Sequence, residues 1–393
     1  MRIETIRLKN FKVFQDTVFT DLPAFCVLLG ANGSGKSTLF DVFGFLQDAL
    51  AENVRSALAR RGGYAEVVSR GHENENILIE IQFRLDVAGV NRLVTYHLEI
   101  GNHTGKPFVR REILRYKRGR HGSPYHFINF ANGSGYAISN EEDFSKPDEE
   151  LDRENQNLGS PDILAVKGLG QFQKFKAASA FRAMLESWHV SDFHIDQARG
   201  SKPAGYAEHL SRTGENLQLV AQYMRENHPE AFATVLTRMK ERVPGVSNVE
   251  AAPTGDGRIM LKFNDSAFKD PFIDQWVSDG TIKMFAYLLL LHDPSPHPLL
   301  CVEEPENQLY PRLLGELAEE FETYSRRGGQ VFVTTHSPDF LNEVDLENIF
   351  CLNKTNGVTT VFRSRDDENV TSLVAAGDKP GWLWKQGLLG GGL

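Results

Sequence analysis

One eight-residue motif constrains this chain more than any other feature, and it reads Gly30-Ala31-Asn32-Gly33-Ser34-Gly35-Lys36-Ser37. It fits the pattern G-x-x-x-x-G-K-[ST] at every fixed position. The apolar run Cys26–Leu29 precedes it, and apolar residues at helical spacing follow it over Thr38–Leu50. A strand, a glycine-rich loop and a helix in this order direct backbone N–H groups and a positive helix end towards phosphate oxygens. The motif therefore predicts a nucleoside-triphosphate site in an α/β protein.

Within this loop we expect the Lys36 ammonium to reach the β- and γ-phosphates and the Ser37 hydroxyl to hold Mg²⁺. The other residues that we expect to contact ATP are Gly30, Ala31, Asn32, Gly33, Ser34, Gly35 and Thr38. A glycine-rich turn without a ligand is the competing interpretation, and the flanking strand and helix disfavour it.

A second feature is a buried-strand pattern, Leu299–Val302, that ends in Glu303 and Glu304. Acidic residues at the end of a central strand face the crevice where α/β proteins bind ligands. Neighbours along a strand point opposite ways, so we assign Glu303 to the metal and Glu304 to the attacking water. A solvated acidic turn is the alternative interpretation.

Two further segments have a structural and a functional interpretation each. His336 follows the predicted strand Gln330–Thr334 and is placed to contact a γ-phosphate or the attacking water. Ser278 and Gly280 open a predicted helix over 279–292, whose N-terminal end is a candidate second phosphate-binding site. Plain helix caps at Ser278 and Ser337 explain both segments equally well when each is taken alone.

The order of these pieces along the chain resembles the ABC ATPase superfamily, and more narrowly its RecF, SMC and OLD-like group of predicted ATPases. The pieces that carry the resemblance are IRLKNFKVF, GANGSGKST, VSDGTIKMF, LLCVEEPENQLYP and VFVTTHSPDFL. The resemblance implies an α/β fold: an ABC-type P-loop NTPase head with a mixed central sheet, flanking helices and an antiparallel β subdomain, plus a helical insert lobe.

In that superfamily two heads enclose two ATP molecules. The resemblance implies an ATP-dependent head-to-head homodimer or higher oligomer, in which Ser278 and Gly280 complete the site formed by the other subunit's Lys36 and Glu304. It also implies that Asn307 lies in the loop that acts across that interface, and that Lys12 lies near the base or ribose. The SMC-like coiled coil and the Toprim nuclease domain of OLD proteins are missing here, so we expect any nuclease-type effector to be a separate protein.

The remaining pattern divides the chain into four parts. Period-two alternation predicts antiparallel strands over 77–87, 92–100 and 108–116. The predicted parts are 1–130, the N-terminal part of the head with the P-loop and β subdomain; 131–205, an insertion; 206–364, the C-terminal part of the head; and 365–393, a tail.

Five segments outside the motifs carry further structural expectations. Segment 131–160 is polar and predicts a surface insertion, and helical spacing predicts helices over 170–187, 214–226 and 229–242. The tail, with Trp382 and Trp384, is either a flexible end or an anchor that packs these two rings on the body.

Composition limits the cellular setting and the ligands. The net charge is −9, which argues against a protein that coats nucleic acid with its whole surface, but not against a local basic patch. No apolar run is long enough for a membrane span, no secretory signal is recognisable, and the three cysteines each lie in an apolar run, so we expect a cytoplasmic protein. DNA is a candidate ligand of one basic hairpin, whose cationic residues are Arg110, Arg111, Arg115, Lys117, Arg118, Arg120 and His121.

The leading functional hypothesis is an Mg²⁺-dependent ATPase whose nucleotide state switches dimerisation, in DNA processing, repair or anti-phage defence. The alternatives are the nucleotide-binding subunit of a membrane transporter, a P-loop kinase for small molecules, and a structural clamp that binds ATP without turnover. The presence of Glu304 and His336 argues against the structural clamp, because both residue types suit ATP hydrolysis.

Overall fold

The computed structural model describes four stretches of the chain: 2–87, 89–116, 125–139 and 150–390. They form two compact units. The first unit is built from three segments, Met1–Trp188, Glu347–Thr371 and Leu389–Leu393. The second is built from two, His189–Leu346 and Ser372–Leu388. The P-loop therefore belongs to the first unit, and the two predicted carboxylates belong to the second.

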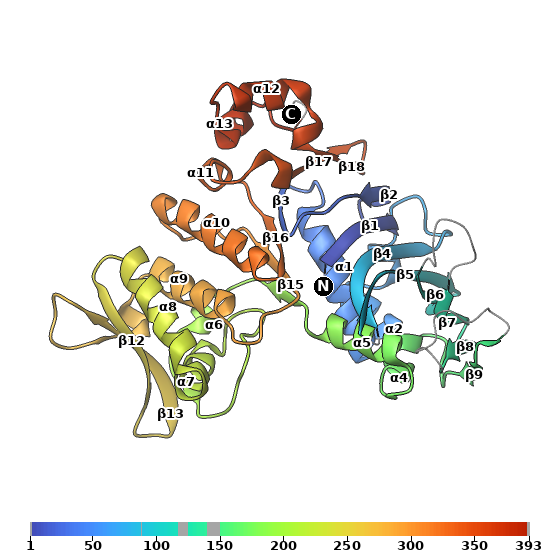
Figure 1. Ribbon diagram of the computed structural model, residues 1–393, viewed down its shortest axis with the longest axis horizontal. Coiled ribbons are helices and arrows are strands. Elements are labelled where there is room, and N and C mark those ends of the chain that lie inside the picture. Colours follow the sequence, from blue (N-terminus) through green and yellow to red (C-terminus); the bar gives the residue numbers. More distant parts are fainter. Residues whose placement is uncertain (1, 88, 117–124, 140–149, 391–393) are drawn as a thin grey trace. The chain divides into compact units, whose positions relative to one another are not determined.

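The large sheet of the first unit is antiparallel and has the strand order β2-β1-β4-β5-β6-β7-β8-β9 (Figure 1). In β4 every second residue is buried, which explains why alternation in the sequence predicted this part correctly. The strands are β1 (Arg2–Phe11), β2 (Phe14–Phe19), β4 (Ile77–Val87), β5 (Val90–His103), β6 (Lys106–Tyr116), β7 (Tyr125–Ala131), β8 (Ser134–Ile138) and β9 (Arg153–Asn157).

The polar segment 131–160 is not only a surface insertion, because it contains β8 and β9. These strands pair antiparallel from Ser134 with Asn157 to Ile138 with Arg153 and extend the large sheet at its edge. Hydrophobic patterning missed β9 because backbone hydrogen bonds hold this edge strand without an apolar sequence, and it missed β8 because that strand has only five residues. Residues 140–149 lie outside the described part.

In the basic hairpin, the Tyr116 ring is buried and stacks on Phe127 with centroids 5.6 Å apart. The Arg92 guanidinium lies over the same ring, 4.7 Å from its centroid. Arg115 lies 3.7 Å from a carboxylate oxygen of Glu80, which offsets part of its charge. The residues Lys117, Arg118, Arg120 and His121 of the predicted patch lie outside the described residues.

Helices cover the buried face of this sheet. Phe181 of α5 packs on Phe83 and Tyr96, with ring centroids 5.1 and 4.5 Å apart. The predicted helix over 170–187 is confirmed only in its second part, as α5. Residues 170–175 are not α-helical and separate α5 from α4, which ends at Leu169, because Gly170 weakens helix continuation. The helices of this unit's first segment are α1 (Lys36–Ala51), α2 (Val54–Ala59), α3 (Tyr64–Val67), α4 (Ala165–Leu169) and α5 (Lys176–Glu186).

A smaller group of strands in the first unit supports the P-loop. Strand β3 (Phe25–Leu29) is buried at all five residues and pairs in parallel with β17 (Ile349–Thr355), more than 300 residues later in the sequence. Strand β17 pairs antiparallel with β18 (Val358–Arg363), and η4 (Ser364–Asp366) and α12 (Glu368–Ala375) follow it. The continuous apolar run before the P-loop is therefore a buried strand, as the sequence predicted.

The second unit contains the strands that carry the predicted carboxylates and histidine. Three parallel strands, β10 (His189–Ser191), β15 (Leu299–Glu303) and β16 (Gln330–Thr334), lie side by side in this order. Helices α9 (Asp279–Leu291) and α10 (Pro311–Arg326) belong to the same unit, and α9 is buried without interruption from its fourth residue. Within the described ranges, no helix is both long and apolar enough to cross a bilayer.

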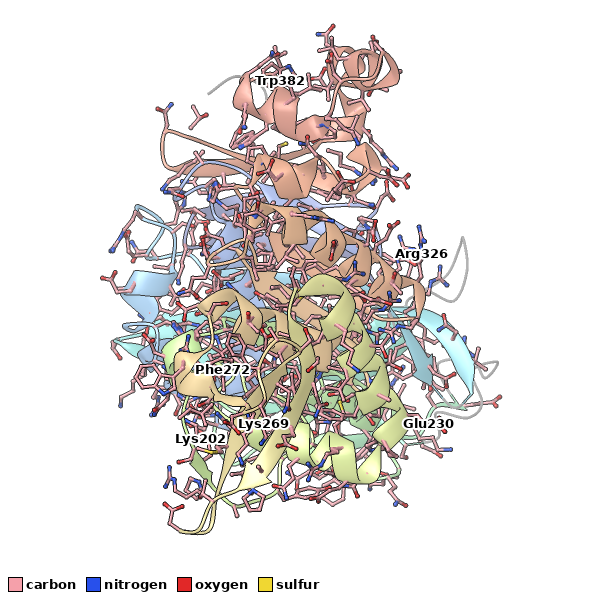
Figure 2. The ribbon with its side chains drawn as sticks, turned by 90° about the vertical axis from the view of Figure 1, so that its left-hand side faces the viewer. Lys202, Glu230, Lys269, Phe272, Arg326 and Trp382 are labelled. Carbon is pink, nitrogen blue, oxygen red and sulfur yellow. The ribbon has the colours of Figure 1, made fainter. Side chains whose placement is uncertain are left out.

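The same unit also holds a small antiparallel sheet with its own helices, and the predicted helices over 214–226 and 229–242 are confirmed. Phe272 is exposed on this sheet and its ring contacts Phe268 (Figure 2). The elements are β11 (Lys202–Pro203), β12 (Val246–Pro253), β13 (Arg258–Asp265), β14 (Phe272–Ile273), η2 (Asp274–Trp276), α6 (Ile195–Ala198), α7 (Leu217–Asn227) and α8 (Pro229–Arg242).

The tail is an anchor, and Leu383 rather than Trp382 is its buried residue. Helix α13 (Pro380–Lys385) packs on α11 (Pro338–Leu341), and a Cβ on Gly381 would lie 1.9 Å from the Pro338 carbonyl oxygen. Leu383 is buried and Trp384 half-buried, whereas Trp382 is 53% exposed (Figure 2). The close approach at Gly381 leaves no room for a side chain between α13 and α11. The remaining short element is η3 (Leu346–Asn348).

Candidate active site

The P-loop has the backbone that phosphate binding requires. Gly35 is the N-cap of α1 in the left-handed region, at φ 108°, and a Cβ there would lie 2.8 Å from Val13 Cγ2. A Cβ on Gly30 would lie 2.4 Å from the Leu352 carbonyl oxygen. Both positions therefore need glycine. Because the N-cap has no side chain, none competes with an anion for the first N–H groups of α1.

Neighbouring side chains hold the loop in this shape. The Lys36 ammonium donates to the carbonyl oxygens of Gly30, at 2.8 Å, and Ala31, at 3.2 Å. The Thr359 hydroxyl of β18 donates to the Ser34 carbonyl oxygen at 2.7 Å. Ser37 is exposed, and Thr38 is half-buried. The apex of the loop is also exposed and consists of Ala31, Asn32 and Gly33. The predicted nucleotide-contacting residues of the loop thus form one preshaped turn at the start of α1.

Lys12 is anchored on the outside of the same helix. Its ammonium lies 2.7 Å from Asp41 Oδ2, and its backbone has φ 51°. Arg61 donates to the other Asp41 oxygen at 2.6 Å and to Asp48 at 2.7 Å. This network orients Lys12, and its contact with a base or ribose stays a prediction.

In the second unit, Glu304 and His336 are brought together. Glu303 is the last residue of β15, and Glu304 follows it with φ 40°. The Glu304 N–H donates to the Thr334 carbonyl oxygen at 3.0 Å, which ties the end of β15 to the end of β16. Glu304 Oε1 lies 3.5 Å from His336 Nε2, and Asn307 Nδ2 donates to Glu304 Oε2 at 3.1 Å. Left-handed backbone at a non-glycine residue concentrates at functional sites, which agrees with a special role for Glu304.

Two residues that the sequence analysis did not single out hold this pair in place. Glu306 Oε1 accepts hydrogen bonds from the Thr335 hydroxyl, at 2.8 Å, and from the His336 N–H, at 2.7 Å. Lys283 of α9 donates to the Asn307 carbonyl oxygen at 2.7 Å. Glu306 and Lys283 both lie in sequence segments that carry the family resemblance. Lys283 could have been found from the sequence, because it is a lysine within the otherwise apolar run of α9.

Lys283 is buried, and its charge is supported by nearby carboxylates. Burial lowers the pKa of its ammonium to about 8, while Glu306, Asp192 and Glu304 oppose that shift. A buried cation that bonds the loop after Glu304 couples α9, which begins at the predicted second phosphate-binding segment, to the carboxylate loop.

The segment Ser278–Thr281 is the N-terminus of α9, and its capping interpretation is confirmed. Ser278 Oγ accepts from the Thr281 N–H at 3.2 Å. A Cβ on Gly280 would lie 2.9 Å from the Gln308 carbonyl oxygen, so this turn packs on the loop after Glu304. The segment also borders a pocket of about 620 Å³, whose other lining residues include Arg242, Gln308 and the 70%-exposed Tyr310.

This fold and this P-loop define an ABC-type P-loop ATPase head of the RecF and SMC-like kind. The chain belongs to the family described as "AAA domain, putative AbiEii toxin, Type IV TA system", which it matches over residues 25–342. Among curated proteins, no sequence matches it.

Solved structures show the same fold at low sequence identity. An SMC head bound to the C-winged helix domain of ScpA has a TM-score of 0.57 and 14% identity, over 92% of this chain and 97% of that one. A Pyrococcus furiosus Smc head with an extended coiled coil, bound to the C-terminal domain of ScpA, has a TM-score of 0.50 and 13% identity, over 95% and 99%. The predicted fold class is therefore confirmed.

Proposed function

We propose that this chain binds ATP with Mg²⁺ and hydrolyses it to ADP and phosphate. The observation that carries the proposal is the P-loop backbone, in which a glycine N-cap leaves the start of α1 open to an anion and Lys36 lies beside it. Residues Gly30 to Thr38 hold the phosphates, and Lys12 contributes to nucleoside binding.

Mg²⁺ suits the residues assigned to it. Ser37 and Glu303 offer a hydroxyl and a carboxylate, which are the hard oxygen ligands that this ion prefers. When bound, the ion neutralises charge on the phosphates.

Hydrolysis is assigned to the pair that the second unit brings together. Glu304 acts as the base that orients and polarises the attacking water. His336 contacts the γ-phosphate or that water, and its backbone is positioned by Glu306. The contacts of Glu304 with His336 and Asn307 support this assignment.

We propose further that the nucleotide controls a head-to-head dimer, in which Ser278 and Gly280 of one subunit complete the site of the other. The exposure of Ser278, at the start of this turn, and of Tyr310 in the adjoining loop supports this use of α9. Closure with ATP and release after hydrolysis make the chain a conformational switch.

The output of the switch is control of a separate effector protein of nuclease type, in DNA processing or anti-phage defence. The family description, a putative toxin of a type IV toxin–antitoxin system, favours a role in defence. The similar SMC heads were solved with a bound domain of ScpA, which supports a separate protein partner for this head as well. DNA is the second candidate ligand.

A mixing experiment tests hydrolysis and the shared site together. Lys36→Ala removes the P-loop lysine, and Ser278→Arg blocks the segment offered to the other subunit. We expect each variant alone to be inactive, with Ser278→Arg still binding ATP. A 1:1 mixture recovers roughly a quarter of the wild-type rate, because half of the dimers are mixed and each has one intact site.

The control is Glu304→Gln, which keeps ATP binding and loses phosphate release in every mixture with Lys36→Ala. Phosphate release and equilibrium binding of a fluorescent ATP analogue are the two measurements. A mixture that stays inactive while wild-type subunits are active and dimeric contradicts the shared site. A wild type that binds no ATP contradicts the whole proposal.

A further inference from the structure

A second group of polar side chains lies in the second unit, at the end of β15 opposite to Glu304. It consists of His209, Asp293 and His297. His209 lies in the loop between β11 and α7, Asp293 follows the last turn of α9, and His297 lies two residues before β15. Three segments that are far apart in sequence therefore meet at one point.

The three side chains approach one another with the atoms that ligate metals. One such atom from each residue lies within 4.8 Å of the others. His209 Nδ1 is 2.7 Å from Asp293 Oδ2, and the rings of His209 and His297 have centroids 5.1 Å apart. Ligand atoms on one zinc-sized ion lie up to about 4 Å apart, so a small rotation of the half-exposed His209 ring completes the set.

A fourth residue, His189, packs against this group. His189 is 7% exposed, and no hydrogen-bond partner of its Nε2 exists among the described residues. Its ring stacks on that of His297, with centroids 4.8 Å apart and an angle of 25° between the planes. A buried imidazole nitrogen without a partner costs free energy unless another group satisfies it.

The group combines two imidazoles with one carboxylate. The Asp293 carboxylate is held in place, because its Oδ1 accepts from the Ser295 N–H at 2.8 Å. Imidazole and carboxylate together are a ligand set for Zn²⁺ and similar transition ions rather than for Mg²⁺.

The backbone around the group is held as a metal site needs. The Tyr324 hydroxyl of α10 donates to the His297 carbonyl oxygen at 2.8 Å. Arg327 donates to the Leu291 carbonyl oxygen at the end of α9, next to Asp293. Two of the three ligands are thus fixed by α10 before an ion arrives, and the third comes from a loop.

We propose that His209, Asp293 and His297 bind a divalent transition ion of the Zn²⁺ class, with the ring of His189 stacked on that of His297. The ion joins the loop before α7 to the turn between α9 and β15. Helix α9 begins just after Ser278 and strand β15 ends just before Glu304, so the ion holds the far ends of these two elements together. Three protein ligands leave a coordination position for water.

Calorimetric titration of the EDTA-treated full chain with ZnCl₂, in the absence of nucleotide, tests the proposal. We expect one Zn²⁺ per chain and a higher melting temperature with Zn²⁺. His209→Ala weakens the binding by about 100-fold or more, because loss of a direct ligand costs at least as much as loss of its supporting group. MgCl₂ gives no comparable heat.

His194→Ala is the matched control, since His194 also lies near a carboxylate, that of Asp192 at 3.5 Å, but outside the group. We expect it to bind Zn²⁺ like the wild type. Equal melting temperatures of wild type and His209→Ala in EDTA show that the variant is folded. Absence of Zn²⁺ binding by the wild type, or equal binding by His209→Ala, overturns the proposal, and ATP turnover is not part of the readout.

Discussion

Glu112 provides the sharpest test of the packing described above. This carboxylate lies on β6, in the middle of the large sheet, and is fully buried. Its oxygens accept hydrogen bonds from the Val166 N–H and the Tyr96 hydroxyl, both at 3.1 Å, and from the Ala165 N–H. It therefore caps the N-terminus of α4 from inside the sheet.

These hydrogen bonds to Glu112 do not fully offset the free-energy cost of removing its carboxylate from water. Burial raises the pKa of Glu112 from 4.5 to about 7, although the hydrogen bonds from Val166, Ala165 and Tyr96 act in the opposite direction. Between these two values the folded chain holds a proton that the unfolded chain has released. The stability from this group is complete below pH 4.5 and is lost as the pH rises through 7.

The magnitude follows from proton linkage. In this window the free energy of unfolding falls by about 1.4 kcal/mol for each pH unit, which sums to about 3 kcal/mol over the whole shift. Glu112→Gln resembles the protonated acid and does not titrate. We therefore expect the variant to gain stability relative to the wild type by about this amount between pH 4.5 and pH 8.

Urea unfolding followed by circular dichroism, for both proteins at pH 5, 6, 7 and 8, measures the difference directly. Subtracting the two curves removes the titration of every other group. Glu154→Gln is the control, because the Lys174 hydrogen bond lowers the pKa of the exposed Glu154 and keeps it ionised throughout this range. A difference curve that is flat, or that favours the wild type at high pH, refutes the assignment.

Two further predictions concern the second unit. Glu306→Gln weakens the bonds to Thr335 and the His336 N–H, so we expect phosphate release to slow by ~10- to 100-fold with ATP binding unchanged. An unaltered kcat, or an equal loss in the control Glu319→Gln, an exposed glutamate of α10, contradicts this positioning role. Gly381→Ala places a methyl group against the Pro338 carbonyl oxygen, so hydrogen exchange in α13 should accelerate, whereas Gly255→Ala, with open space around it, should leave it unchanged. Equal protection of α13 in both variants would show that its docking does not depend on this contact.

Much of the first unit was predictable from sequence because the rules involved are local. Alternation in β4 to β6 follows from one buried face, and the glycines of the P-loop follow from its backbone. The polar edge strand β9 escaped prediction because backbone pairing holds it without an apolar sequence, and β8 escaped because its five residues are too few to show an alternating pattern.

The identities of the candidate hydrolysis residues were predictable from the sequence, but the contacts that position them were not. The sequence alone identifies Glu304 and His336, since each follows an apolar strand. That Glu306 bonds the His336 backbone, and that Lys283 bonds the Asn307 carbonyl, depends on how parallel strands and α9 pack. No local pattern encodes a contact between a side chain and a backbone group that lie 24 or 30 residues apart.

By itself, then, the sequence determined the phosphate loop, the order of the ATPase motifs and the alternation of most strands, because sterics and hydrogen bonding between near neighbours impose them. Tertiary structure alone decided that Leu383 rather than Trp382 anchors the tail, and that His209 and His297 meet Asp293. Those outcomes depend on which surfaces are buried against one another, and burial is a property of the packed chain as a whole.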